Sequence, residues 1–350
     1  MMKEKPDIKS MNLPELVSFV ENLGEKPFRA KQLYEWMHRN LSESIEEMTN
    51  LSAGFREKLK EECTYTVLKQ TDVQISKQDG TRKYLFMLED GNVIESVWMR
   101  YKFGNSVCIS SQAGCRMGCR FCASAIGGLE RNLLPSEMLE QVYRIQKDTD
   151  ERVSRVVVMG TGEPLDNYDS LLRFIRLLTD EGGLHISQRN LTVSTCGLVP
   201  EILRLADEKL QITLAVSLHA PTQKKRLALM PIASKYDVEQ VRDACRYYFE
   251  KTGRRITFEY ALAAGVNDGN EDAYNLADLL IGQNCHVNLI PINPVKERKF
   301  FSSDQEAVLS FKNKLEKNGI HVTIRREMGR DIDAACGQLR KKYMERRWVT

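Results

Sequence analysis

The chain has 350 residues, of which 42% are hydrophobic and 28% are charged, which is the composition of an ordinary globular protein. No apolar run approaches the roughly 18 residues that a membrane-spanning helix needs. The N-terminal residues lead into no apolar core, so we expect no signal peptide. Nine cysteines without a signal peptide indicate a reducing compartment and metal or redox chemistry, so we expect a cytoplasmic protein.

The net charge of +3 is unevenly distributed along the chain. Residues 325–350 contain eight Lys or Arg and four Asp or Glu, a surplus of +4, while the remainder carries −1. A basic C-terminal segment on a neutral body is typical of contact with a polyanion. A solvated helix end would give the same charge pattern, so this clue needs support from other residues.

Residues 1–62 are expected to form an N-terminal helical accessory domain. Apolar side chains recur at helical spacing, and Gly24 ends the first helix. The expected helices are 13–23, 28–37 and 51–59.

Residues 63–103 change to β-rich runs and are expected to form a β-meander extension. The pairs Asp79-Gly80 and Asp90-Gly91 are tight-turn signals between these runs. Three antiparallel strands would therefore precede the next part of the chain.

Residues 104–330 alternate between short β-rich runs and helical stretches. The expected strands are 107–110, 155–160, 191–196, 212–219, 256–262 and 287–291, with a further run at 321–326. The expected helices are 135–148, 169–181, 199–208, 237–251, 270–281 and 304–317. This alternation predicts an α/β fold with parallel strands and right-handed crossovers. Six units are too few for a closed eight-stranded barrel, so we expect a partial (β/α)6 barrel with its site at the C-terminal strand ends.

Three cysteines lie in one short loop, in the run GCRMGCRFCA that contains Cys115, Cys119 and Cys122. Three thiolates can hold a four-iron, four-sulfur cluster and leave one iron without a protein ligand, whereas fully ligated clusters of this type use four cysteines. An open iron can bind a substrate, and this arrangement is needed to chelate S-adenosylmethionine and cleave it by one-electron reduction. A structural zinc site would need a fourth ligand, and no second cysteine pair is spaced for it.

Polar residues and glycines follow the expected strands. The run GTGEPL at 160–165 places Gly162 and Glu163 at a strand end, where a carboxylate can accept hydrogen bonds from an ammonium group. Ser194 ends the next strand, and further strands end at Ser217–His219 and at Asn293. Each residue alone would be typical of a cap or turn. Together they describe one pocket rim.

Two further cysteines stand apart from the loop. Cys108 ends the first barrel strand, and Cys336 lies in the run DIDAACGQL, where small residues and glycine suit a flexible loop. Taken alone, each would be interpreted as a buried or idle thiol. Residues 331–350 are expected to form a C-terminal loop and basic tail.

These residues together resemble the RlmN/Cfr family of radical S-adenosylmethionine RNA methyltransferases, over nearly the whole chain. The most specific runs are CISSQAGC at 108–115, GTGEPL at 160–165, SLH at 217–219 and DIDAACGQL at 331–339. Within the family, members that methylate adenine C8 tend to carry alanine where Pro164 stands. The resemblance is therefore to the adenine-C2 branch.

The resemblance implies roles for the matched positions. Cys115, Cys119 and Cys122 would hold a [4Fe-4S] cluster. The S-adenosylmethionine contacts would be Gly162, Glu163, Ser194, Ser217, Leu218, His219 and Asn293. Cys336 would carry a methyl group, Cys108 would be its partner thiol, and Glu95 would be a proton acceptor. The N-terminal helices would bind RNA.

The implied reaction methylates C2 of adenine 2503 in 23S ribosomal RNA and of adenine 37 in some transfer RNAs. It would use two S-adenosylmethionine molecules per turnover, a methylated cysteine and a 5′-deoxyadenosyl radical. The resemblance also implies an electron donor such as flavodoxin or ferredoxin, a transient disulfide between Cys108 and Cys336, and a monomer. Lys224, Lys225, Arg226, Arg325, Arg326 and the tail from Arg340 to Arg347 are candidates for phosphate contacts.

Three alternatives remain open from the residues. A C8 methyltransferase would differ in its product. A radical enzyme acting on protein would not need Cys336 and Cys108 together. A non-catalytic iron–sulfur or zinc module that binds RNA would not turn over S-adenosylmethionine.

Overall fold

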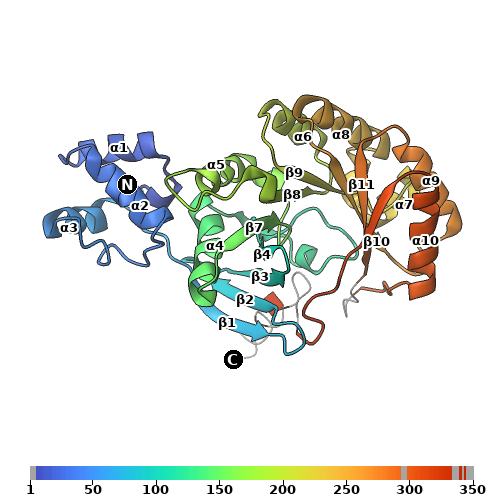
Figure 1. Cartoon of the computed structure of the whole chain (residues 1–350), viewed down its shortest axis with the longest axis horizontal. Coiled ribbons are helices and arrows are strands. Elements are labelled where there is room, and N and C mark those ends of the chain that lie inside the picture. The colour runs from blue at the N-terminus through green and yellow to red at the C-terminus, as the bar shows by residue number, and fades with distance from the viewer. Residues whose placement is uncertain (1–4, 293–297, 333–338, 341–342, 344–350) are drawn as a thin grey trace.

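The computed structural model describes residues 5–292, 298–332, 339–340 and 343. Its first part is helical, as the sequence predicts, with α1 at Leu13–Asn22, α2 at Phe28–His38 and α3 at Ala53–Glu62. Asn12 begins α1 with a capping box, because its side chain accepts the Glu15 N–H and the Glu15 carboxylate accepts the Asn12 N–H, both at 2.9 Å. Figure 1 shows these helices together at one end of the molecule.

This helical module packs against α4, at Pro135–Thr149, through two buried polar contacts. The Lys9 ammonium lies 2.7 Å from the Glu140 carboxylate. His38 Nδ1 lies 2.8 Å from the Tyr143 hydroxyl. The domain boundary near residue 62 remains a prediction.

The expected meander is present as three antiparallel strands, β1 at Lys69–Ile75, β2 at Arg82–Met87 and β3 at Val93–Tyr101. Both predicted turn glycines adopt left-handed backbone, with φ of 75° at Gly80 and 82° at Gly91. The meander does not form a separate sheet. β3 pairs with β4, so it extends the barrel sheet at one edge.

The barrel strands are parallel neighbours in chain order, as expected. They are β4 at Gly104–Ile109, β7 at Val153–Val158, β8 at Leu191–Thr195, β9 at Thr213–Ser217, β10 at Ile256–Leu262, β11 at Cys285–Pro291 and β12 at His321–Ile324. The further run that the sequence indicates after the last helix is thus a seventh parallel strand. The sheet of the described residues ends at β1 and at β12, so the barrel is partial.

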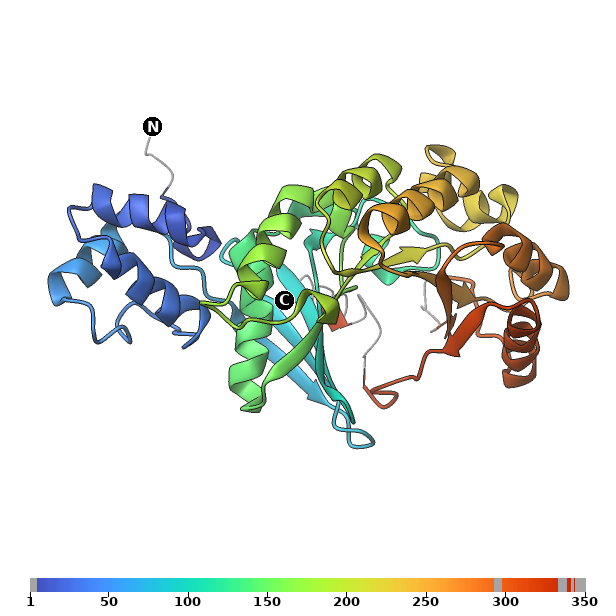
Figure 2. The same cartoon turned by 45° about the horizontal axis from the view of Figure 1, so that its top comes forward.

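Helices cover the convex side of this sheet (Figures 1 and 2). After α4 they are α5 at Tyr168–Thr179, α6 at Val199–Asp207, α8 at Val238–Thr252, α9 at Asn270–Leu280 and α10 at Gln305–Lys317. The sequence predicts each of them within two residues at either end. No helix in the described ranges is long and apolar enough to cross a membrane.

Sequence reasoning missed two small features. The strands β5, at Gln112–Gly114, and β6, at Leu129–Asn132, form a separate two-stranded sheet around the cysteine loop. A short helix, α7 at Gln223–Leu229, follows β9. Both are too short for hydrophobic periodicity to reveal.

Candidate active site

The strand register gives the sheet one continuous inner face. Residues paired across adjacent strands point to the same side of a sheet. Glu95 and Val97 lie two residues apart on β3 and so point to the same side. Val97 pairs with Cys108 on β4, and Cys108 pairs with Val157 on β7. Continuing through the register, the same face carries Thr192, Ser194, Ala215, Ser217, Glu259, Asn288 and Thr323. Four residues that the sequence singles out, Glu95, Cys108, Ser194 and Ser217, therefore share this face.

The opposite face of the sheet is apolar and packs against the helices. Tyr84, Phe86, Ile94 and Val107 belong to the main hydrophobic core, whereas Val97, Met99 and Cys108 form a separate small cluster. Alternation of side chains thus separates a face that packs in the main core from the inner face. The inner face carries the polar residues named above and is the one available for chemistry.

The neck of the cysteine loop is fixed by a close backbone approach. The Cys115 N–H donates to the Gly128 carbonyl at 2.8 Å. Gly114 has a φ of 85°, and a Cβ added there would lie 2.1 Å from the same carbonyl oxygen. Only glycine fits this position, which holds Cys115 at the end of β5.

The three loop cysteines are electrostatic neighbours. Burial raises the pKa of the Cys115 thiol to about 12, and the charges of Cys122 and Glu163 act in the same direction. Burial also raises the pKa of Cys119, and Cys122 and Cys115 add to it. Thiols grouped in this way become thiolates readily only beside a bound metal, which supplies the positive charge.

The three thiols form a donor set that fits an iron–sulfur cluster. Among the described residues, no three His, Cys, Asp or Glu side chains converge on one ion position. Thiolates that bind different irons of one cluster need not converge in that way. Cys115, Cys119 and Cys122 supply soft ligands, as such clusters require.

The end of β7 approaches the backbone after β4 very closely. A Cβ at Gly162, where φ is 113°, would lie 2.7 Å from the Ser111 Oγ and the Gln112 Cβ. A Cβ at Gly160 would lie 2.7 Å from the Ile109 carbonyl oxygen. In the described structure, the buried Ser111 Oγ has no hydrogen-bond partner. A buried hydroxyl without a partner beside a glycine is suited to a bound ligand.

Glu163 joins the ends of two neighbouring strands. Its Oε2 accepts the Cys196 N–H at 2.7 Å, and its Oε1 accepts the Leu165 N–H at 3.1 Å. Burial raises the pKa of this carboxyl, and hydrogen bonds from the Cys196 backbone, the Cys196 and Thr195 side chains and the Leu165 backbone act against that rise. The two side-chain donors can rotate away, so the carboxylate can accept hydrogen bonds from an ammonium in their place.

His219 follows β9 in an unusual backbone conformation. Its φ is 57°, its Nδ1 accepts the Ala261 N–H at 3.0 Å, and its carbonyl accepts the Asn267 side-chain amide at 2.7 Å. Burial, with the charge of Arg226, lowers the pKa of His219 to about 3. The ring is therefore neutral and carries its proton on Nε2.

Two of the expected site residues, Cys336 and Asn293, lie outside the described residues. The structure does describe the residues before and after the segment that contains Cys336, and both of these flanking parts contact the meander. On the N-terminal side, the Gly329 N–H donates to Asp79 at 2.9 Å, and Asp331 accepts the Ser76 hydroxyl at 2.6 Å. Met328 packs against the cluster that contains Cys108.

On the C-terminal side, Leu339 is buried against Leu85 and Val93. The Arg340 N–H donates to the Glu95 carboxylate at 2.5 Å. Both contacts lie on the inner face of β2 and β3. The ends of the segment that contains Cys336 are therefore held over the face that carries Glu95 and Cys108.

One candidate phosphate contact is wrong. Arg226 is completely buried, and its guanidinium donates to the carbonyls of Cys196 (2.7 Å) and Tyr236 (3.2 Å). Its charge therefore supports the end of β8 rather than a ligand on the surface. Lys225 pairs with the buried Asp272 at 2.7 Å but remains partly exposed.

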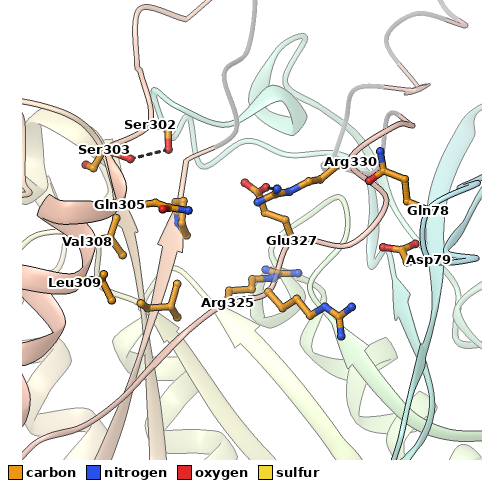
Figure 3. Close-up of a pocket in the computed structure, with 13 residues that line it drawn as sticks. Gln78, Asp79, Ser302, Ser303, Gln305, Val308, Leu309, Arg325, Glu327 and Arg330 are labelled. Atoms are coloured by element: carbon orange, nitrogen blue, oxygen red, sulfur yellow. Dashed lines mark hydrogen bonds and ion pairs between the residues drawn. The ribbon is translucent and has the colours of Figure 1, made fainter.

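A cavity of about 760 Å³ lies beside the open edge of the barrel. Figure 3 shows Arg325 and Arg330 between the β1–β2 turn, with Gln78 and Asp79, and the start of α10. Arg326 also lines it. In the described structure, Arg330 pairs with Glu327, and no salt bridge involves Arg325 or Arg326.

An aromatic pair at the tip of the β3–β4 hairpin was missed by sequence reasoning. The rings of Tyr101 and Phe103 stack with centroids 5.0 Å apart, and the Arg155 guanidinium lies 4.5 Å from the Phe103 ring centre. Phe103 is 62% exposed. Burial raises the pKa of Tyr101, whereas the charges of Arg325 and Arg326 lower it, so the hairpin and the cavity adjoin.

Comparisons with known proteins agree with this geometry. The family model described as the Radical SAM superfamily matches residues 109–277. The model described as the ribosomal RNA large subunit methyltransferase N-terminal domain matches residues 7–64. A crystal structure of a radical SAM methyltransferase from Sphaerobacter thermophilus is 41% identical, covers 95% of this chain and 98% of its own, and superposes with a TM-score of 0.92.

Similar sequences agree over the full length. A probable dual-specificity RNA methyltransferase RlmN of Lachnospira eligens is 65% identical, over 97% of each chain. Its counterpart in Lachnoclostridium phytofermentans is 58% identical, over 99% of this chain and 97% of its own. The chain therefore belongs to the RlmN family of radical S-adenosylmethionine RNA methyltransferases.

Proposed function

We propose that this methyltransferase acts on C2 of adenine 2503 in 23S ribosomal RNA and of adenine 37 in some transfer RNAs. One observation carries the proposal. Glu95 and Cys108 share one face of the sheet, and both described ends of the segment that contains Cys336 bind that face. A methyl carrier, a resolving thiol and a proton acceptor would then meet at one place.

Cys115, Cys119 and Cys122 would hold the [4Fe-4S] cluster. When bound, the cluster supplies the electron that cleaves S-adenosylmethionine to methionine and a 5′-deoxyadenosyl radical. Glu163 would bind the amino group of S-adenosylmethionine, since its carboxylate lies at the strand end beside Gly162 and an ammonium forms strong hydrogen bonds with a carboxylate.

Polar groups on the neighbouring strands would bind the rest of the same molecule. Ser194 and Ser217 lie on the inner face of adjacent strands, and Leu218 and His219 continue from Ser217. The fixed Nε2–H of His219 is a donor suited to a ribose or carboxylate oxygen. Asn293 completes the proposed set.

Two cysteines are needed because adenine C2 lies between two ring nitrogens and is electron-poor. It cannot attack an electrophilic methyl group, whereas a thiolate can. The Cys336 thiolate would form a bond to the methyl carbon of one S-adenosylmethionine, and S-adenosylhomocysteine would leave. Removal of a hydrogen atom from that methyl group, by the radical from a second S-adenosylmethionine, lets its carbon add to C2 of the base.

The enzyme and the RNA are then covalently joined through Cys336. The radical formed on addition to C2 must lose one electron, for which the oxidised cluster would be the acceptor, and Glu95 would accept the proton lost from C2. The Cys108 thiolate would then attack the Cys336 sulfur, which breaks the bond between sulfur and the transferred carbon and forms a disulfide. The released carbon would take up a proton and become the new methyl group. An external reductant must reset that disulfide before the next turnover.

The RNA would approach at the barrel edge near the arginine-lined cavity. Phosphates suit the exposed Arg325 and Arg326, and an unstacked base suits the exposed ring of Phe103. The target adenine must leave its stack to present C2 to the inner face. The helical module of residues 7–64 would add a second RNA contact.

The remaining partners follow from the chemistry of the reaction. A flavodoxin or ferredoxin would supply electrons, and a reducing cytoplasm would hold both the RNA and the free thiols. The enzyme would act as a monomer.

The test is product identification. Anaerobically reconstituted protein receives S-adenosylmethionine, reductant and 23S RNA, and the methyl-adenosine isomer is then identified by mass spectrometry. We expect 2-methyladenosine at the stated position. Formation of 8-methyladenosine, or of 5′-deoxyadenosine without any RNA methylation, would overturn the proposal.

A further inference from the structure

Lys83 is a completely buried lysine beside the proposed proton acceptor. It lies on β2, where it pairs with Val97, and its neighbour two residues on, Leu85, pairs with Glu95. The Lys83 ammonium is 2.8 Å from Glu95 Oε2, and the two side chains are 0% and 3% exposed. This ion pair lies on the inner face, one strand from Cys108.

The geometry of Glu95 is constrained from three directions. Lys83 contacts one carboxylate oxygen, and the Arg340 N–H donates to the other. The Glu95 backbone carbonyl accepts the Ser110 hydroxyl at 2.7 Å. The carboxylate is therefore held between β2 and the segment that leads back to Cys336.

Stability alone does not account for this pair. Taking an ammonium and a carboxylate out of water costs several kcal/mol per ion, and apolar replacements for such pairs are often neutral or stabilising. The surrounding residues of the inner face, Leu85, Val93 and Val97, are apolar and would accommodate such a replacement. Removing the lysine alone would leave the buried Glu95 carboxylate without the cation that holds it in place, which is costly for a buried pair.

Resting on the function proposed above, we propose that Lys83 is a positioning residue for proton removal from adenine C2. Its ammonium fixes the position of the Glu95 carboxylate beside Arg340. Without Lys83, Glu95 would not be held where it can take the C2 proton, although methylation of Cys336 and cleavage of S-adenosylmethionine would continue. The covalent enzyme–RNA intermediate would then accumulate.

The test compares Lys83→Met, Glu95→Gln and the double variant in reconstituted full-length enzyme. The substrate RNA carries either hydrogen or deuterium at C2 of the target adenine. Single-turnover experiments follow methyl-Cys336, the protein–RNA adduct and the methylated product. We expect Lys83→Met to slow product release from the adduct on the order of 100-fold, as for a lost general base, with a deuterium isotope effect that the wild type does not show.

The double variant provides a second test if Lys83→Met does not fold. With both residues replaced, no unpaired charge remains in the buried site. The rate of the double variant should equal that of Glu95→Gln, because residues acting through one group are not additive. If the rate of the double variant is instead lower than the wild-type rate by the product of the two single-variant effects, Lys83 acts in a different step from Glu95. If the Lys83→Met enzyme forms less methyl-Cys336 and less product to the same extent, and shows no isotope effect, then Lys83 has only a structural role.

The chain offers a matched control in Lys9. It is equally buried and pairs with Glu140 at 2.7 Å, but at the junction of the helical module and α4. Lys9→Met should lower thermal stability and leave adduct turnover without an isotope effect. If Glu95→Gln itself turns over normally, the proposed role of Glu95 fails. If Glu95→Gln accumulates adduct and Lys83→Met does not, only the inference about Lys83 fails.

Discussion

Phe121 and His219 pack edge to face, with ring centroids 4.9 Å apart and planes at 86°. Phe121 lies between Cys119 and Cys122 in the cysteine loop, whereas His219 follows β9. The contact therefore connects the proposed cluster loop directly to a proposed S-adenosylmethionine contact. On its other side, His219 is fixed by the Ala261 N–H.

Phe121→Ala should loosen His219 without removing a cysteine. An aromatic pair of this kind contributes about 0.5–1.5 kcal/mol, so we expect the Kd for S-adenosylmethionine to rise roughly two- to tenfold. Iron content should stay at the wild-type level. Equilibrium binding and iron analysis measure the two effects. Phe300→Ala is the control, because Phe300 also packs on Phe121, at 6.4 Å, but makes no ring contact with His219.

Cys336→Ala should abolish RNA methylation and leave the cluster intact, because the methyl carrier is separate from the cluster ligands. Visible absorbance and electron paramagnetic resonance report the cluster, and mass spectrometry reports the product. A Cys336→Ala enzyme that still methylates RNA would contradict the carrier role.

Cys108→Ala should trap the protein–RNA adduct, because no thiol remains to attack the Cys336 sulfur. A denaturing gel with labelled RNA detects the adduct as a band of reduced mobility. Cys245→Ala is a suitable control, since Cys245 lies on α8 and is buried in the main core. Clean turnover by Cys108→Ala would exclude the resolving role.

Phe103→Ala should raise the KM for RNA with little change in kcat, because the exposed ring would stack a base outside the reacting centre. Stacking of this kind contributes about 1–3 kcal/mol, so we expect a KM increase of about tenfold. Arg325→Ala should instead flatten the dependence of binding on salt concentration. Tyr274→Ala, at an exposed position on α9, should change neither quantity.

Acid should weaken the helical module through His38. Burial, with the charge of Lys9, lowers its pKa from 6.5 to about 3. Below pH 6.5 the unfolded chain binds a proton that the folded chain does not, so the free energy of unfolding falls by about 1.4 kcal/mol per pH unit for this group. That loss continues until the pH approaches 3.

His38→Gln cannot titrate and should therefore show a shallower loss of stability between pH 7.5 and pH 5.5. Urea unfolding under anaerobic conditions measures the difference. Some loss should remain, because burial also lowers the pKa values of His219 and His286. His185→Asn, at an exposed position, is the control for removal of an imidazole.

Periodicity predicted the arrangement of this fold well, because its helices and strands are long enough to show a repeat. The strand at 256–262 and the helices between the barrel strands could be predicted without any knowledge of tertiary contacts. The strands β5 and β6 have only three and four residues, and their pairing depends on the turn geometry at Gly114. No repeat can form over so short a length.

A candidate site can be proposed from the sequence where the chemistry is local, as in the cysteine loop and at Glu163. The roles of these residues stay predictions. Lys83 was not predicted, because its proposed role depends on a strand register that brings it to Glu95. A charged residue inside the apolar run 83–88 was the available signal. The prediction that Arg226 contacts phosphate was wrong, because a run of basic residues does not show which of them the fold buries.

The two anchors of the C-terminal segment have a consequence for the order of folding. Asp331 binds Ser76 across 255 positions of sequence, and Arg340 binds Glu95 across 245. Contacts this distant form late, because a long loop must close first. The hairpins of the meander need no such loop, so they can form before either anchor. The inner face around Glu95 is therefore completed in one of the last steps of folding.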